Sequence, residues 1–350
     1  MTSGSKVTDN TSLPDKLPAG PPSRWADLRR LRVSQEQIVF LIAVALFVLF
    51  SVVLPGFLNA DNILSLLQSV ALLGMLGLGM GLVIIGRGID LAMVATMVMS
   101  AGWVVTQMNN GVGFWPAALL ALGFAVGVGV ILGVLIAYVE IPPIFATLAM
   151  ATVIFGFARL GMVNLDVVYV PGGHDSFRAL GAGQVLGVPM PVVLFAALAV
   201  LVHLFLRYTK AGRYIFMMGD NPLTARITGL PVRPMIILQY VLSSLVSFLT
   251  GLVTAAAVGS MNTRLITGTM VYDVILVVVL GGIGLAGGKG GARNVLVGTL
   301  LIGTLLNGMT IMNFDYTSQN IIKSLVLLGA IVIDTLVNPR DEQTSQQGDI

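Results

Sequence analysis

Cysteine is absent from the 350 residues of this chain, which also holds only two histidines and few charged residues. The lack of cysteine excludes disulfides, thiolate metal sites and cysteine nucleophiles. Two histidines, His174 and His203, are too few for a histidine metal cluster. Charged residues make up 10% of the chain and hydrophobic residues 56%, whereas soluble domains carry about 25% charged residues. This composition excludes an ordinary water-soluble globule and predicts an integral membrane protein.

Apolar runs of about twenty residues recur along the chain, and each could cross a hydrocarbon core of about 30 Å as a helix. Backbone groups in lipid must bond within their own segment, which favours helices, and the continuous apolar runs at 38–54 and 193–206 lack the alternation of barrel strands. We therefore predict an all-α integral membrane protein with about ten transmembrane helices, over 36–55, 60–85, 89–107, 114–138, 142–163, 189–207, 233–259, 270–287, 293–312 and 318–337.

Positive charge predicts how these helices are oriented. Residues 1–34 are polar, rich in proline and end in several arginines, which predicts a disordered cytoplasmic tail. Under this orientation the inside loops hold most of the lysine and arginine, and the outside loops hold little beyond Arg178 and Arg264. The prediction is a transmembrane domain over 35–338 and a cytoplasmic C-terminal tail over 339–350, with both termini inside.

The polar loop over 207–233 reads as a short helix between two apolar segments. Asn221 is a good N-cap, Pro222 suits the first helical position and Gly229 suits the C-terminal stop. An apolar edge is formed by Leu223, Ile227 and Leu230. Such a helix could lie on the lipid surface as a connector or dock against another protein, and these residues alone favour neither. The predicted topology places it in the cytoplasm.

Charged and polar residues interrupt the apolar stretches at a few positions. Arg87 and Asp90 lie in the segment Gly86–Leu91, which is either a tight turn at the cytoplasmic surface or a broken helix lining a pathway. Late in the chain a second polar set consists of Asn307, Lys323 and Asp334. These residues either line a pathway or find partners, and we favour Lys323 reaching the outer surface and Asp334 the inner one.

Glycines gather in the segment Leu280–Gly291, which resembles a phosphate-binding loop at first sight. A true loop of this kind has glycine five positions before the Gly-Lys pair and Ser or Thr after it, whereas this chain has Ile283 and Gly290 there. We interpret these glycines as close helix packing followed by a tight cytoplasmic turn. Small-residue packing faces are also predicted at Gly77/Gly81, Gly123/Gly127 and Gly129/Gly133.

Several of these segments, taken in order, resemble the permease subunit of bacterial ribose-type ABC sugar importers, within the larger family that includes branched-chain amino-acid permeases. The segments that carry the resemblance are Gly88-Ile89-Asp90-Leu91, Pro143 to Leu148, Gly219-Asp220-Asn221 through Gly229-Leu230, and Leu280 to Gly290. Ala92 stands where the family has serine and Ala149 where it usually has glycine. The resemblance covers nearly the whole membrane region.

The resemblance implies a permease fold like that of the cobalamin importer, in a multi-pass protein of the bacterial inner membrane. It implies no catalytic residue, metal or cofactor on this chain, with ATP and magnesium held by a cytoplasmic ATP-binding subunit. A periplasmic sugar-binding protein, a second permease chain and membrane lipid are the other implied partners, and nucleic acid is not one. The residues implied to couple to the ATPase are Gly219, Asp220, Asn221, Ala225, Arg226 and Gly229. Those assigned to the pathway or to a structural turn are Arg87, Gly88, Asp90 and Asn307.

Three alternatives to import of a simple sugar or polyol remain open. An ABC permease for branched-chain amino acids or nucleosides is the nearest. An ion-coupled secondary carrier would need intramembrane acids, and its candidates Asp90, Asp273 and Asp334 all lie near predicted span ends. A membrane enzyme is the weakest, because no nucleophile–base or carboxylate-pair arrangement stands out.

Overall fold

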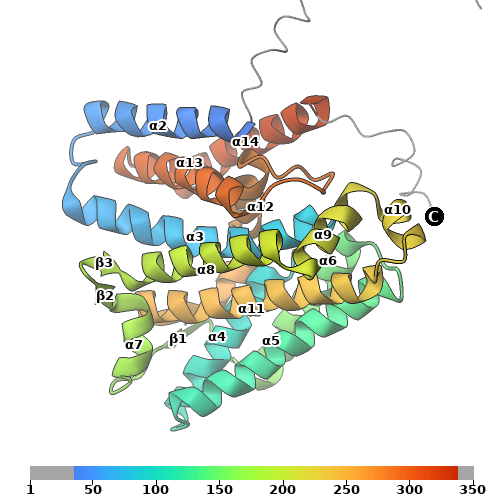
Figure 1. Ribbon diagram of the computed structural model, residues 1–350. Helices are drawn as coiled ribbons and strands as arrows, with labels where there is room; N and C mark the ends of the chain where they lie inside the picture. Colours follow the sequence, from blue (N-terminus) through green and yellow to red (C-terminus); the bar gives the residue numbers. More distant parts are fainter. Residues whose placement is uncertain (1–34, 338–350) are drawn as a thin grey trace, which may run out of the picture. The chain divides into compact units, whose positions relative to one another are not determined.

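The computed structural model describes residues 35–337 (Figure 1). The tails predicted at 1–34 and 339–350 lie outside the described residues. Every predicted span corresponds to a helix; the ten are α2 (Gln35–Val53), α3 (Ala60–Ile85), α4 (Met93–Asn109), α5 (Phe114–Ala137), α6 (Pro143–Gly161), α8 (Met190–Tyr208), α11 (Val232–Val258), α12 (Met270–Leu280), α13 (Ala292–Ile311) and α14 (Tyr316–Val337).

Seven of these helices are long and apolar enough to cross a membrane, namely α2, α3, α5, α6, α8, α11 and α13. The protein is therefore an all-α integral membrane protein, to which short strands add two small sheets. Helix α4 has 17 residues and α12 has 11, which correspond to about 26 and 16 Å. Both are shorter than predicted because residues 86–92 and 281–291 leave the helical path. The count of ten spans stays a prediction.

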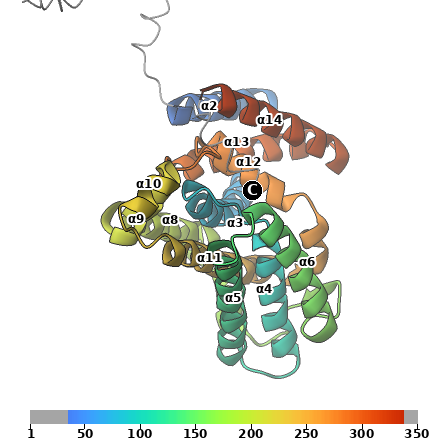
Figure 2. The same ribbon diagram turned by 90° about the vertical axis from the view of Figure 1, so that its right-hand side faces the viewer.

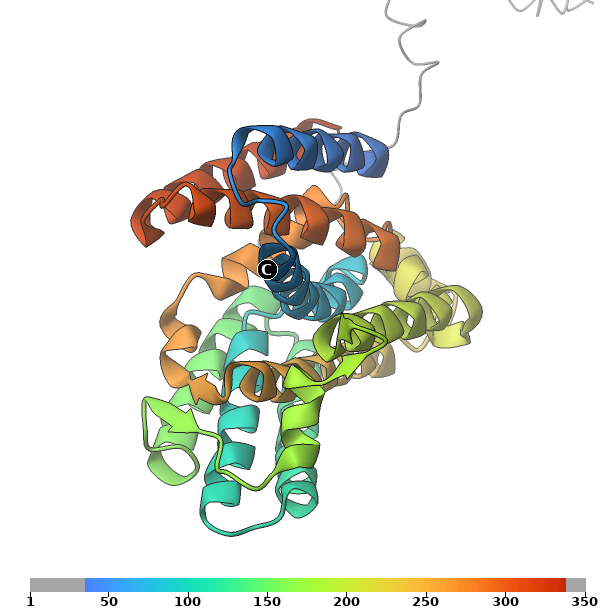
Figure 3. The ribbon, with the colours of Figure 1, turned by 90° about the vertical axis from the view of Figure 1, so that its left-hand side faces the viewer.

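Helices α3 and α11 form the centre of the packing. Helix α11 packs against α3, α4 and α5, and α3 packs against α8, α12 and α13. Helices α2, α13 and α14 lie on one side of α3, and α4 and α5 lie on the other (Figures 1, 2 and 3). The start of α2 and the end of α14 lie at the end of the helices that also holds α10 (Figure 1). We call this the α10 end and the opposite one the sheet end.

Glycines allow the closest approach between helices. A Cβ on Gly129 or Gly133 would lie 2.6 Å from the Val241 Cα and 2.5 Å from the Ile237 Cα respectively, so α5 and α11 meet there backbone to backbone. The packing face predicted at Gly129/Gly133 is confirmed. Gly123 and Gly127 have no atom within 4 Å of an added Cβ among the described residues, so the packing face predicted there has no partner in this part of the chain.

Short strands and one helix close the sheet end. Strand β1 (Val167–Tyr169) pairs antiparallel with β4 (Ser260–Asn262), strand β2 (Gln184–Val185) pairs with β3 (Val188–Pro189), and α7 (Asp175–Ala182) lies between β1 and β2 in the chain. Asp166, just before β1, accepts hydrogen bonds from Arg159 at 2.6 Å and from Arg264 at 2.8 Å. Asp166 therefore ties the start of β1 to the last turn of α6 through Arg159 and to the segment after β4 through Arg264.

The Asp166 cluster predicts a pH dependence. Hydrogen bonds from Arg264, and then from Arg159, hold the pKa of Asp166 below the ordinary aspartate value. A carboxyl whose folded pKa is lowered stabilises the fold at pH values above its unfolded pKa, and this stabilisation is lost as the pH falls through the folded pKa. Thermal unfolding in detergent should therefore show wild type more stable than Asp166→Asn at neutral pH, with the difference vanishing in acid. A difference that stays constant with pH would contradict this assignment.

Candidate functional site

The polar loop over 207–233 folds into two short helices, α9 (Lys210–Asp220) and α10 (Pro222–Ile227). Thr209 caps α9 through its hydroxyl, which accepts from the Gly212 N–H at 2.9 Å. The Asn221 side chain accepts from the Thr224 N–H at 3.0 Å and caps α10, which satisfies a donor that the first turn leaves unpaired. The short helix predicted from Asn221, Pro222 and Gly229 is present.

Two backbone hydrogen bonds at Gly229 and Leu230 end helix α10. The Gly229 N–H donates to the Arg226 carbonyl at 3.1 Å, and the Leu230 N–H donates to the Ala225 carbonyl at 3.0 Å. This is the Schellman arrangement, which needs a left-handed residue at the position of Gly229, and its φ is +77°. Gly229 therefore shapes the helix end, whether or not it touches a partner.

The faces of α10 differ in their surroundings. Ala225 is buried against Met218 and Val232, whereas Leu223 and Ile227 are 53% and 86% exposed. Of the residues assigned to coupling, Ala225 thus faces inward. The exposed apolar surface consists of Leu223 and Ile227, which the predicted coupling set left out.

The last turn of α9 rests on the end of α3. Arg87, just after α3, donates through Nε to the Gly219 carbonyl at 2.6 Å and through Nη2 to the Asp220 carbonyl at 2.8 Å. These carbonyls form the negative end of the α9 dipole, where a cation is favourable. A Cβ on Gly219 would overlap the Ile85 carbonyl, so only glycine permits this approach.

A third segment, the glycine-rich loop over 281–291, contacts the same ends of α3 and α9. The Gly288 N–H donates to the Ile85 carbonyl at 2.8 Å, and a Cβ on Gly219 would lie 2.6 Å from the Gly288 nitrogen. Three motifs far apart in the sequence thus share one contact point. We call this contact of Ile85, Arg87, Gly219, Asp220 and Gly288 the junction.

The non-helical residues 86–92 continue from the junction into the protein interior. Asp90 is 1% exposed; one carboxylate oxygen accepts from the Ala92 N–H at 3.1 Å and the other from the Ser243 hydroxyl at 2.6 Å. The Tyr240 hydroxyl donates to the Ile89 carbonyl at 3.1 Å. A side chain on Gly88 would meet that same hydroxyl.

These bonds fasten the turn to α11, so the segment is both a tight turn near the α10 end and a break between α3 and α4. A pathway role for Asp90 stays a prediction.

Asn307 on α13 has a partner on α3. Its amide donates to the Asn62 carbonyl oxygen at 2.9 Å, and the Asn62 amide donates back to Asn307 at 3.1 Å. Each of these partly buried side chains therefore satisfies the other, as polar groups that are shielded from water require. The sequence indicated that Asn307 needs a partner or a pathway, and the structure provides the partner.

The sequence of this chain matches known proteins over most of its length. Residues 62–334 match the family described as the permease component of the branched-chain amino acid transport system. The chain belongs to this permease family. It is 31% identical to a ribose import permease of Escherichia coli over 303 residues, 85% of this chain and 93% of the relative. For a ribose import permease of Bacillus subtilis the identity is 33% over 306 residues, 86% of this chain and 93% of the relative.

A fructose import permease of Rhizobium meliloti is 30% identical over 313 residues, which cover 87% of this chain and 86% of the relative. No solved structure gives a significant match. Family membership and the seven apolar helices make this permease a multi-pass protein of the inner membrane. As a member of this family it is a transport subunit rather than an enzyme.

Lys323 of the permease is buried in an ion pair. It is 7% exposed, and its Nζ lies 2.8 and 2.9 Å from the two carboxylate oxygens of Asp273. The expectation that Lys323 reaches the outer surface was therefore wrong, because Asp273 on α12 neutralises it inside. The side chain of Asp334 lies outside the described part of the protein.

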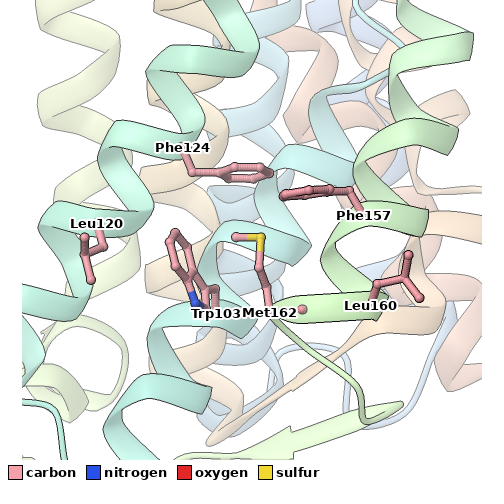
Figure 4. A pocket seen from close by; sticks show the side chains of 7 residues that line it. Trp103, Leu120, Phe124, Phe157, Leu160 and Met162 are labelled. Atoms are coloured by element: carbon pink, nitrogen blue, oxygen red, sulfur yellow. The ribbon is translucent and has the colours of Figure 1, made fainter.

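Three cavities of the permease differ in chemistry. One of about 520 Å³ between α4, α5 and α6 is apolar, with Phe124, Phe157 and Met162 around it (Figure 4). A cavity of about 400 Å³ lies beside α10 at Arg226 and Arg233. The third, of about 320 Å³, lies between α12 and α14 and contains the Asp273–Lys323 pair.

Proposed function

We propose that this chain is the transmembrane permease subunit of an ATP-driven importer for a simple sugar or polyol. The supporting observation is the match over most of the chain to permeases named for ribose and fructose import. The family description favours branched-chain amino acids as the second candidate. An ion-coupled carrier has less support, since Asp90 is bonded to Ser243 and Asp273 to Lys323.

In this proposal all ten helices cross the membrane in a fold like that of the cobalamin importer. The α10 end faces the cytoplasm, because it carries the loop with Arg207, Lys210 and Arg213. Both chain termini then lie inside. Helices α4 and α12 complete their crossings through residues 86–92 and 281–291, which is tolerated where non-helical backbone is packed within protein.

The proposed partners occupy opposite ends. A cytoplasmic ATP-binding subunit, which carries ATP and magnesium, docks on the exposed Leu223 and Ile227. A periplasmic sugar-binding protein docks at the sheet end, and a second permease chain completes the transporter within lipid. In the coupling set, Asn221 and Gly229 hold the ends of α10, Ala225 anchors it inward, and Arg226 lies on its last turn.

The junction supports a route for coupling. Displacement of α10 by the ATPase would move α9, whose carbonyls are held by Arg87. The turn carrying Arg87 is tied to α11 through Asp90, and Gly288 ties α3 to the loop between α12 and α13. One movement at α10 thus reaches four membrane helices, as alternating access requires. Gly219 and Asp220 are the points of transmission.

Reconstitution tests the function. The permease is placed in proteoliposomes together with the proposed ATP-binding subunit and sugar-binding protein, and uptake of labelled ribose, fructose, arabinose and leucine is measured with and without ATP. We expect ATP-dependent uptake of one sugar. Uptake of leucine alone would establish the second candidate, and uptake driven by an ion gradient without ATP would refute both.

Replacing Ile227 with aspartate should weaken docking of the ATPase by about tenfold or more, since a central apolar contact is lost. Leu186→Asp is the matched control, because Leu186 is fully exposed at the sheet end and aspartate tolerates its left-handed backbone. ATPase retention on the immobilised permease is the measurement. Equal retention by both variants would remove α10 from the contact. Ala225 is a poorer test site, because a bulky replacement there disturbs packing as well.

A further inference from the structure

The cavity between α12 and α14 combines an apolar wall with a polar floor. Its polar residues are Thr269, Asp273, Asn320, Lys323 and Ser324, and a tyrosine, three leucines and an isoleucine complete the lining, namely Tyr272, Leu276, Leu327, Leu328 and Ile331. Its volume of about 320 Å³ is at the small end of the range for ligand pockets, about 300–1,000 Å³. A small solute fits this space.

The charges in this cavity cancel each other. The Asp273 and Lys323 side chains are 16% and 8% exposed and form one close pair. Ionisable groups at membrane depth are costly and mark solute pathways when they are retained. The pair carries no net charge, so the cavity suits a solute that carries no net charge.

The cavity contains both hydrogen-bond donors and hydrogen-bond acceptors. An ammonium has three donors and a carboxylate about four acceptor positions, so the ion pair retains capacity for further bonds. The Thr269 hydroxyl bonds the Asn320 carbonyl oxygen at 3.2 Å and the Tyr316 hydroxyl at 3.2 Å. The Asn320 side chain also bonds the Tyr316 hydroxyl, and because its amide group has two N–H donors, one remains for a further bond. Donors and acceptors placed side by side match vicinal hydroxyl groups, each of which both donates and accepts.

We propose that this cavity binds the transported solute, a neutral polyhydroxylated molecule, in the half of the membrane nearer the sheet end. The hydroxyl groups bond Asn320, Ser324 and the Asp273–Lys323 pair, and the carbon–hydrogen face lies against the leucines of α14. This inference rests on the proposed function, since it names a binding site for the imported solute.

The absence of cysteine makes the site directly testable. Ser324→Cys introduces one thiol into the cavity with little change in volume, and Leu325→Cys is its matched control, on the next residue of α14 and 64% exposed outside the cavity lining. The assembled importer is treated with a charged thiosulfonate reagent. Parallel samples contain ribose, fructose, arabinose or, as a solute without hydroxyl groups, glycine at equal concentration.

We expect the Ser324→Cys thiol to react, and the sugar that the wild type transports to slow the reaction at least threefold, whereas glycine does not. Reaction that no sugar slows would overturn the inference, since the cavity would then hold only water. A thiol that reacts only with a lipid-soluble maleimide would also overturn it, since lipid or the second chain would fill the space. Failure of the proposed function is separate: the wild type would then import no sugar at all.

Transport by Asn320→Ala gives a second readout. The loss of one hydrogen bond should lower kcat/KM about fivefold, with ATPase docking unchanged because Asn320 lies at the other end of the protein. The control Ile321→Ala changes an exposed neighbour outside the lining. Equal kinetics for the two variants would count against the site even if labelling succeeds.

Discussion

Replacing Lys323 with methionine is expected to destabilise the permease by about 3–5 kcal/mol, the usual cost of removing one partner of a buried ion pair. The substitution leaves Asp273 at 16% exposure without its counter-ion. Methionine keeps most of the side-chain volume, so the loss measures the uncompensated charge rather than a cavity. Thermal unfolding in detergent micelles gives the comparison with wild type.

Two controls separate charge from packing. The double variant Lys323→Met with Asp273→Asn removes both charges and should regain most of the stability, because a neutral pair no longer carries the desolvation cost. Arg233→Met breaks the ion pair of Arg233 with Glu140, which spans 3.5 Å with both side chains more than half exposed. Exposed pairs contribute about 0–1 kcal/mol. If Lys323→Met is as mild as Arg233→Met, the pair is hydrated and the burial argument fails.

The helices of this permease follow directly from its sequence. Lipid permits few backbone solutions, so an apolar run such as 114–138 or 233–259 needs no knowledge of its neighbours to be assigned. The predicted helix boundaries at residues 89 and 287 were wrong. Near both positions, distant partners hold a glycine-containing segment with charged residues in a non-helical conformation. The backbone of Gly288, for instance, bonds to Ile85, which no local pattern reveals.

In the candidate site, too, local features could be predicted from the sequence, whereas contacts with distant residues could not. Capping by Asn221 and Gly229 is local chemistry and could be predicted. The inward position of Ala225 also had a signal, because Leu223 and Ile227 are four residues apart on one helical face and Ala225 is half a turn from both. The partners of Arg87 and Lys323 lie 132 and 50 residues away. A charge in an apolar run indicates that a partner exists, but only the packed helices identify it.

Replacing Gly219 with alanine is expected to abolish ATP-driven uptake while the ATPase still docks. The added methyl group overlaps the Ile85 carbonyl and would lie 2.6 Å from the Gly288 nitrogen. These neighbours are backbone atoms, which cannot rotate away as a side chain can, so α9 must separate from the end of α3. Overpacking of this kind costs about 1–3 kcal/mol. The separation pulls the Gly219 and Asp220 carbonyls away from Arg87 and opens the junction.

The test measures uptake and ATPase retention in the same preparation. Gly127→Ala on α5 is the matched control: it makes the same chemical change in another helix, and an added Cβ there meets no described atom within 4 Å. Alanine also favours a helix over glycine by about 1 kcal/mol, so poor helix formation cannot explain a loss at Gly219. Because Leu223 and Ile227 keep their exposed face, retention should match wild type. Normal uptake by Gly219→Ala would show that force from α10 reaches the membrane helices by another route.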